Sequence, residues 1–93
     1  MLSTLENLFK LARERKVKPV DGSYTNKLLS NKSLSKSKVL EEINELIEAV
    51  EKDTNKIHEA ADVFYHLIIY LEAHNIKIED IEKELEKRKK SNE

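Results

Sequence analysis

The segment from residue 56 to residue 74 constrains the fold most, because it is apolar around nearly the whole circumference of a helical wheel. A helix with this pattern has to be buried by other elements. Three of its polar residues, Glu59, Asp62 and His66, lie on one stripe within an arc of about 60°. Burying an unpaired carboxylate is costly, so the stripe needs a cation, a Lys or Arg partner, or exposure to solvent.

The remainder of the chain also favours helices. One Gly and one Pro in 93 residues leave little turn chemistry, which argues against an all-β fold. We therefore expect one all-α domain over residues 1–93, a helical hairpin core with flanking helices. Helical spacing predicts helices over residues 2–15, 25–30, 36–52, 56–74 and 79–90, and a loop over 31–37 in which Ser33, Ser35 or Ser37 caps the next helix.

Composition excludes several classes of protein. With 39% hydrophobic and 38% charged residues, the chain is too apolar for a disordered polymer and too charged for a membrane protein. It has no cysteine, so disulfides, thiolate zinc sites and cysteine nucleophiles are excluded. No apolar run of membrane-spanning length and no secretory signal is visible, and we expect a cytoplasmic protein without a membrane partner.

The charge is distributed unevenly along the chain. Residues 1–40 contain nine Lys or Arg and three Asp or Glu, whereas residues 41–86 contain four Lys and fourteen Asp or Glu. The formal net charge is -1, so a nucleic-acid partner is not expected. A basic segment beside an acidic one suits an anionic ligand held through metal ions, and it equally suits internal salt bridges.

Five carboxylates form the pattern that carries chemistry. Glu41, Glu42 and Glu45 lie in the first helix of the expected hairpin, and Glu59 and Asp62 lie in the second. A spacing of three residues places each pair on one helix face, and an antiparallel hairpin can bring the pairs together. Four facing carboxylates repel one another unless cations are present. Divalent cations with all-oxygen ligands, Mg²⁺ or Mn²⁺, meet that need.

The same residues have a plainer interpretation. Glu42 and Glu45 alone are typical of a solvated helix face, because Glu is a good helix former. That interpretation is weaker for Glu59 and Asp62, whose helix reads as buried. We expect His66 to be a hydrogen-bonded structural residue rather than a ligand. His58 and His74 have no supporting neighbours in the sequence and read as surface residues.

Three motifs resemble those of phosphoribosyl-ATP pyrophosphohydrolases. Residues 22–29 are similar to that family's G-S-Y-T-x-K-L-L, residues 38–42 to its K-V-x-E-E, and residues 59–67 to its E-A-A-D-L-x-Y-H-L. Residues 81–88 also look like the last helix of that family. The carboxylate pattern by itself marks only the wider superfamily of all-α NTP pyrophosphatases, which includes MazG-like enzymes.

The resemblance implies an activity and a cofactor. The activity is hydrolysis of phosphoribosyl-ATP between its α- and β-phosphates, giving phosphoribosyl-AMP and pyrophosphate, the second step of histidine biosynthesis. The cofactor is Mg²⁺, with Mn²⁺ as a substitute. The implied metal ligands are Glu42, Glu45, Glu59 and Asp62; the implied catalytic residue, which orients water, is Glu41; and the implied substrate-binding residues are Ser23, Lys27 and Lys38.

Some features depart from the family or leave alternatives open. Ser33-Leu34-Ser35 stands where the family has an Asp-Lys-Ile-like element, and the loop is one residue shorter.

A housekeeping (d)NTP pyrophosphatase with the same metals, or a non-catalytic helical dimerisation module, also fits the residues. In each case we expect a homodimer, because one small chain cannot cover all sides of the apolar segment 57–71.

Overall fold

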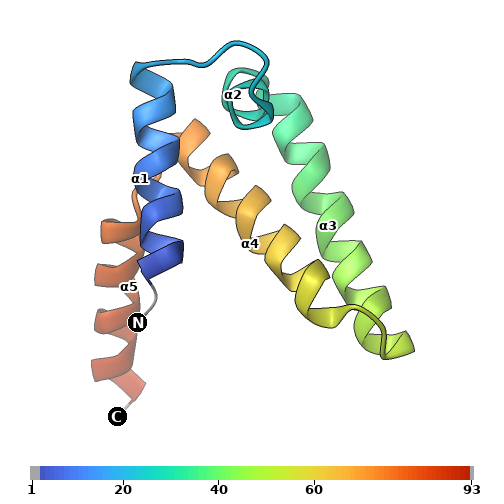
Figure 1. Ribbon diagram of the computed structural model, residues 1–93. Helices are drawn as coiled ribbons and strands as arrows, with labels where there is room; N and C mark the ends of the chain where they lie inside the picture. The colour runs from blue at the N-terminus through green and yellow to red at the C-terminus, as the bar shows by residue number, and fades with distance from the viewer. Residues whose placement is uncertain (1–2, 93) are drawn as a thin grey trace.

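The computed structural model describes residues 3–92 and consists of α-helices joined by short connections (Figure 1). No strand occurs within that range, which confirms the all-α expectation. None of the described helices is long and apolar enough to cross a membrane. The helices are α1 (Ser3–Val17), α2 (Tyr24–Ser30), α3 (Lys32–Lys52), α4 (Lys56–Ala73) and α5 (Ile78–Asn92).

Helices α3 and α4 form the expected hairpin, and α4 lies between α3 and α1 (Figure 1). The chain reverses through Asp53 and Asn55, which both adopt left-handed backbone conformations with φ of 56° and 37°. The Asp53 backbone N–H donates to the carbonyls of Ala49 and Val50 and so ends α3. Helices α1 and α2 pack against α4, and the centre of the core is formed by Ala12, Leu28 and Ile69.

The prediction of a loop over residues 31–37 is wrong, because α3 already begins at Lys32. The Asn31 side chain caps it by accepting a hydrogen bond from the Leu34 backbone N–H at 3.0 Å. Because Asn31 already accepts a backbone N–H group of the first turn of α3, no serine is needed as the N-cap. Ser35 is instead an internal residue of α3, and its side chain is buried.

Burial of the hairpin is incomplete. The C-terminal half of α4 is covered as predicted, with Ile68 and Ile69 buried. Its N-terminal half leaves Ile57 and Phe64 exposed. Helix α3 also turns apolar residues away from the core of this chain. The exposed apolar residues of α3 are Leu40, Ile43, Ile47 and Val50.

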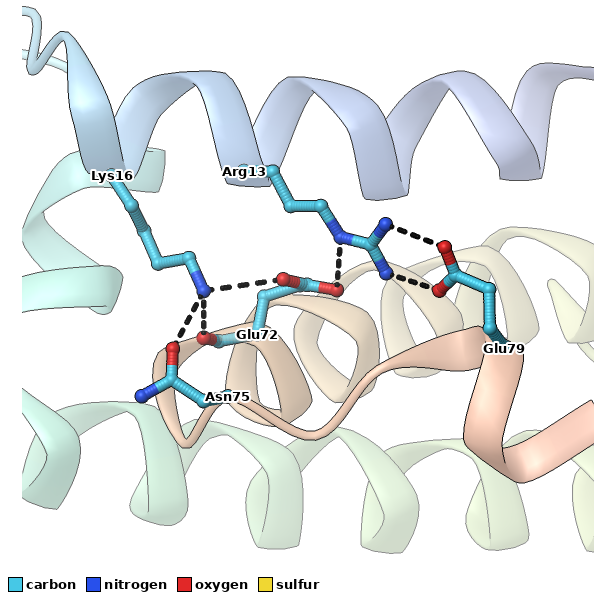
Figure 2. Close-up of polar contacts among 5 residues, drawn as sticks. All are labelled: Arg13, Lys16, Glu72, Asn75 and Glu79. Atoms are coloured by element: carbon cyan, nitrogen blue, oxygen red, sulfur yellow. Dashed lines mark hydrogen bonds and ion pairs between the residues drawn. The ribbon is translucent and has the colours of Figure 1, made fainter.

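A buried carboxylate joins three helices (Figure 2). The side chain of Glu72, near the end of α4, is only 1% exposed. Its Oε2 accepts from Arg13 Nε at 3.1 Å, and its Oε1 pairs with Lys16 Nζ at 3.2 Å. Arg13 also donates to both carboxylate oxygens of Glu79 in α5, at 2.9 and 2.6 Å. Two cations of α1 thus hold the end of α4 and the start of α5.

We expect Glu72→Gln to lower the free energy of unfolding by about 2–3 kcal/mol, because two cations lose a charged hydrogen-bond acceptor. Urea denaturation at neutral pH, followed by circular dichroism, measures the loss. Glu79→Gln is the matched control, with a clearly smaller expected loss because its ion pair is exposed. Equal losses in the two variants would show that burial of Glu72 adds nothing.

Candidate metal and substrate site

The α3–α4 hairpin brings carboxylates from both helices together. One oxygen from each of Glu42, Glu45 and Glu59 lies within 4.8 Å of the others. Glu42 and Glu45 are one turn apart on α3, and Glu59 stands in the first turn of α4, just past the chain reversal. Asp62 lies one turn further along α4. Together with His58 and Glu59 it forms a second group, whose ligand atoms also lie within 4.8 Å of one another. We call Glu42, Glu45, Glu59 and Asp62 the carboxylate cluster; the predicted metal ligands therefore lie side by side.

The carboxylate cluster is partly shielded from solvent. Glu42 is only 8% exposed, although it lies on an otherwise polar edge of α3. Burial and the nearby charge of Glu45 raise the pKa of Glu42. The same two causes, in the same order, raise the pKa of Glu59. One oxygen of Glu42 and one of Glu59 are enclosed and have no hydrogen-bond partner among the described residues.

The donor set fits a divalent cation. All four side chains of the carboxylate cluster offer oxygen ligands, which Mg²⁺ and Mn²⁺ prefer. Among the side chains described, no Lys or Arg forms an ion pair with Glu42, Glu45 or Glu59. The enclosed, unpartnered oxygens therefore lack the positive charge that buried carboxylates require.

His66 is a structural residue, as expected. It is buried, and its Nδ1 lies 2.8 Å from the Asp62 backbone oxygen, which can only accept. In the neutral ring, Nδ1–H therefore donates, and Nε2 accepts from the Tyr24 hydroxyl at 3.0 Å. Both ring nitrogens are engaged, so His66 orders α2 against the part of α4 that carries Asp62. The Tyr65 hydroxyl adds a second link, 2.5 Å from Thr25 Oγ1.

Lys38 and Glu41 lie next to the carboxylate cluster. They are one turn apart on α3, and Lys38 Nζ is 3.1 Å from Glu41 Oε2. The hydrogen bond to Glu41, followed by the charge of that carboxylate and smaller contributions from Tyr24 and Glu42, raises the pKa of Lys38. The predicted catalytic residue and one predicted phosphate-binding residue are therefore paired with each other.

Ser23 and Lys27 lie elsewhere, in an adjoining hollow between the end of α1 and α2. Gly22, with φ of 78°, makes the turn that precedes α2. Ser23 caps α2, and its Oγ accepts from the Asn26 backbone N–H at 3.3 Å and from Arg15 Nη1 at 2.8 Å. Tyr24 lines this hollow and also contacts His66, so it connects the hollow with the carboxylate cluster.

One residue of this region was missed by sequence reasoning. His58 is exposed, as expected, but it does have a neighbour, because its Nε2 lies 3.4 Å from Asp62 Oδ2. The ligand atoms of His58, Glu59 and Asp62 all fall within 4.8 Å of one another. The signal was the spacing of four residues between His58 and Asp62, which places both side chains on one helix face.

Known proteins resemble this chain over nearly its whole length. A family model described as phosphoribosyl-ATP pyrophosphohydrolase matches residues 2–89. The phosphoribosyl-ATP pyrophosphatase of Clostridium acetobutylicum is 48% identical over 89 residues, which cover 90% of this chain and 79% of that protein. The corresponding enzyme of Bacillus cytotoxicus is 40% identical over 92 residues, 95% of this chain and 85% of that one.

A longer relative also matches. A histidine biosynthesis bifunctional protein of Caldanaerobacter subterraneus is 39% identical over 93 residues, which cover 96% of this chain and 45% of that protein. The matched region of the longer protein is thus about the length of the present chain.

We expect Glu42→Gln to raise the melting temperature in EDTA at pH 8 by about 4 °C or more, which corresponds to about 1 kcal/mol in a domain of this size. The raised pKa values of Glu42 and Glu59 mean that the folded state binds more protons than the unfolded state above their ordinary value of 4.5. Stability without metal therefore falls as pH rises through the raised pKa values.

Thermal melts of wild type and variant between pH 4.5 and pH 8 test this. Glu48→Gln is the control, since Glu48 is exposed and paired with Lys52 at 2.5 Å. A Glu42→Gln variant that melts no higher than wild type at pH 8 would contradict repulsion within the carboxylate cluster.

Proposed function

Because this chain belongs to the phosphoribosyl-ATP pyrophosphohydrolase family, we propose that it hydrolyses phosphoribosyl-ATP to phosphoribosyl-AMP and pyrophosphate in histidine biosynthesis. The whole chain acts as one catalytic domain in this proposal. The observation that carries it is the carboxylate cluster, with its enclosed oxygens on Glu42 and Glu59. A cytoplasmic location is part of this proposal, and it agrees with a highly charged nucleotide substrate, which does not cross membranes unaided.

Glu42, Glu45, Glu59 and Asp62 would hold Mg²⁺, or Mn²⁺ in its place. The support is an all-oxygen donor set from two helices and the absence of an ion pair to Glu42, Glu45 and Glu59 among the described side chains. When bound, a divalent cation offsets polyphosphate charge and lowers the pKa of a bound water. The four carboxylates would fix the position of the bound cation, because they project from the packed α3–α4 hairpin.

Glu41 would orient the attacking water and accept its proton, and Lys38 would bind a substrate phosphate. Their pairing at 3.1 Å supports this, because each keeps the other beside the carboxylate cluster. Ser23 and Lys27 would bind another part of the substrate in the hollow that Arg15 also lines. The distribution of charge suits the proposal, since a polyphosphate between this basic hollow and metal-loaded carboxylates meets positive charge on both sides.

We expect Glu59→Gln and Asp62→Asn each to lower kcat by about 100-fold or more, because each removes a metal ligand. Glu48→Gln, which alters an exposed carboxylate of α3, should keep wild-type activity. Pyrophosphate release from phosphoribosyl-ATP, with and without Mg²⁺, is the measurement.

A panel of dNTPs assayed in parallel separates the alternatives. Turnover of dNTPs in preference to phosphoribosyl-ATP would favour a housekeeping pyrophosphatase with the same metal site. No turnover of any nucleotide would favour a non-catalytic dimerisation module. Full activity in Glu59→Gln or Asp62→Asn would refute the assigned ligands.

The working form would be a homodimer. Four exposed apolar residues follow one face of α3 at helical spacing, and α4 adds Ile57 and Phe64. Monomeric proteins rarely expose a contiguous apolar surface of this kind. A two-fold arrangement that pairs the α3–α4 hairpins buries both copies of this surface in a helix bundle. Basic residues of one subunit could then approach the acidic hairpin of the other.

Ile47→Lys should convert the dimer to a monomer, because a charge replaces an apolar side chain at the centre of the proposed interface. Leu85→Lys is the matched control on α5, since Ile47 is 51% exposed and Leu85 is 56% exposed in the single chain. Light scattering at micromolar concentration distinguishes the two states. A wild-type monomer near 10.9 kDa that remains active would refute the proposed dimer.

A further inference from the structure

The first two turns of α4 present a nitrogen donor beside the carboxylate cluster. His58 and Asp62 are four residues apart and share a helix face, and Glu59 is adjacent to His58 in the sequence. The His58 Nε2 and Asp62 Oδ2 atoms lie 3.4 Å apart. All three side chains offer ligand atoms within 4.8 Å of one another. The imidazole reaches this point from solvent, since its side chain is 72% exposed.

The spacing of these atoms suits a small divalent ion. Two ligands at about 2.1 Å from a tetrahedral ion are separated by about 3.4 Å, which is the length of the tetrahedron's edge. An ion between His58 and Asp62 would therefore need little movement of either side chain. His58 also differs in kind from its neighbours, because it is the one nitrogen donor in either of the two groups found among the described residues.

A second observation points to a ligand at the same place. Glu59 belongs to both groups, and one of its oxygens is enclosed without a hydrogen-bond partner. Glu42, which shares the other group with Glu59, is only 8% exposed and also has an unpartnered oxygen. The lysine in the first turn of α4 does not supply the missing charge, because Lys56 pairs with Asp53 at 2.5 Å.

We propose that His58, Glu59 and Asp62 form a subsite for a divalent transition-metal ion such as Co²⁺ or Zn²⁺, and that His58 sets the preference of this site among cations. The proposal rests on the proposed function, since Glu59 and Asp62 are shared with the Mg²⁺ ligands. Imidazole is a good ligand for Co²⁺ and Zn²⁺, whereas Mg²⁺ strongly prefers oxygen. A nitrogen donor therefore strengthens transition-metal binding and leaves Mg²⁺ binding almost unchanged.

Titration of the intact protein with Co²⁺ tests the subsite without any substrate. Binding is followed by calorimetry and by the visible absorption of the bound ion, which reports its ligands. His58→Gln should weaken Co²⁺ binding by about tenfold or more and change the absorption, because one ligand is lost. Its affinity for Mg²⁺ should stay within about twofold of wild type. His74→Gln, at the other end of the same helix, is the control and should bind both ions as wild type does.

The possible results separate clearly. Unchanged Co²⁺ affinity in His58→Gln, no Co²⁺ binding by wild type, or equal losses for Co²⁺ and Mg²⁺ would each overturn the subsite. Release of pyrophosphate from phosphoribosyl-ATP with Mg²⁺, measured on the same preparations, judges the proposed function independently. An inactive wild type that still shows the His58-dependent loss of Co²⁺ binding would retain the subsite and reject the function.

Discussion

Helix α4 is an apolar helix with carboxylates near both of its ends, and the rest of the structure depends on how each end is neutralised. At the C-terminal end, Arg13 and Lys16 of α1 reach the buried carboxylate of Glu72. At the N-terminal end, Glu59 lies beside further carboxylates from α3 and its own helix and beside His58, and no Lys or Arg among the described side chains pairs with it. Buried carboxylates are stable only when they are paired. The chain thus provides its own cations at one end, whereas in the proposed function an external cation would neutralise the other end.

This difference also explains which helices cover α4. Arg13 and Lys16 bring α1 onto the C-terminal half, and α2 follows because the connection between the two helices is short. The N-terminal half keeps Ile57 and Phe64 exposed, so one side of the hairpin is acidic and another is apolar and exposed. Tyr24 of α2 is hydrogen-bonded to His66 of α4, and His66 is in turn hydrogen-bonded to the Asp62 backbone oxygen. Packing of α2 against α4 therefore helps to order the end of α4 that carries Glu59 and Asp62.

The sequence predicted the hairpin and the convergence of the acidic residues because both depend on helical periodicity, which is a local property. It did not predict the pairing of Glu72, since its cations stand 56 and 59 residues away and only the packing of α1 brings them near. The start of α3 was misplaced because three serines competed as caps with Asn31, and propensity alone does not decide between them. The contact between His58 and Asp62 was not predicted, although the spacing of four residues that indicates it is a local feature of the sequence.

The ion pairs of Glu72 on α4 and the Lys38–Glu41 pair on α3 also differ in how easily they can be exchanged, and this matters for the proposed reaction. The pairs of Glu72 are buried, so breaking them leaves an uncompensated charge and costs several kcal/mol. The Lys38–Glu41 pair lies partly in solvent, where such pairs contribute little to stability. A substrate phosphate can therefore take Lys38 from Glu41 at little cost. That exchange would release the Glu41 carboxylate to accept a proton from water at the moment the substrate is bound, while the buried pairs keep the helices in place.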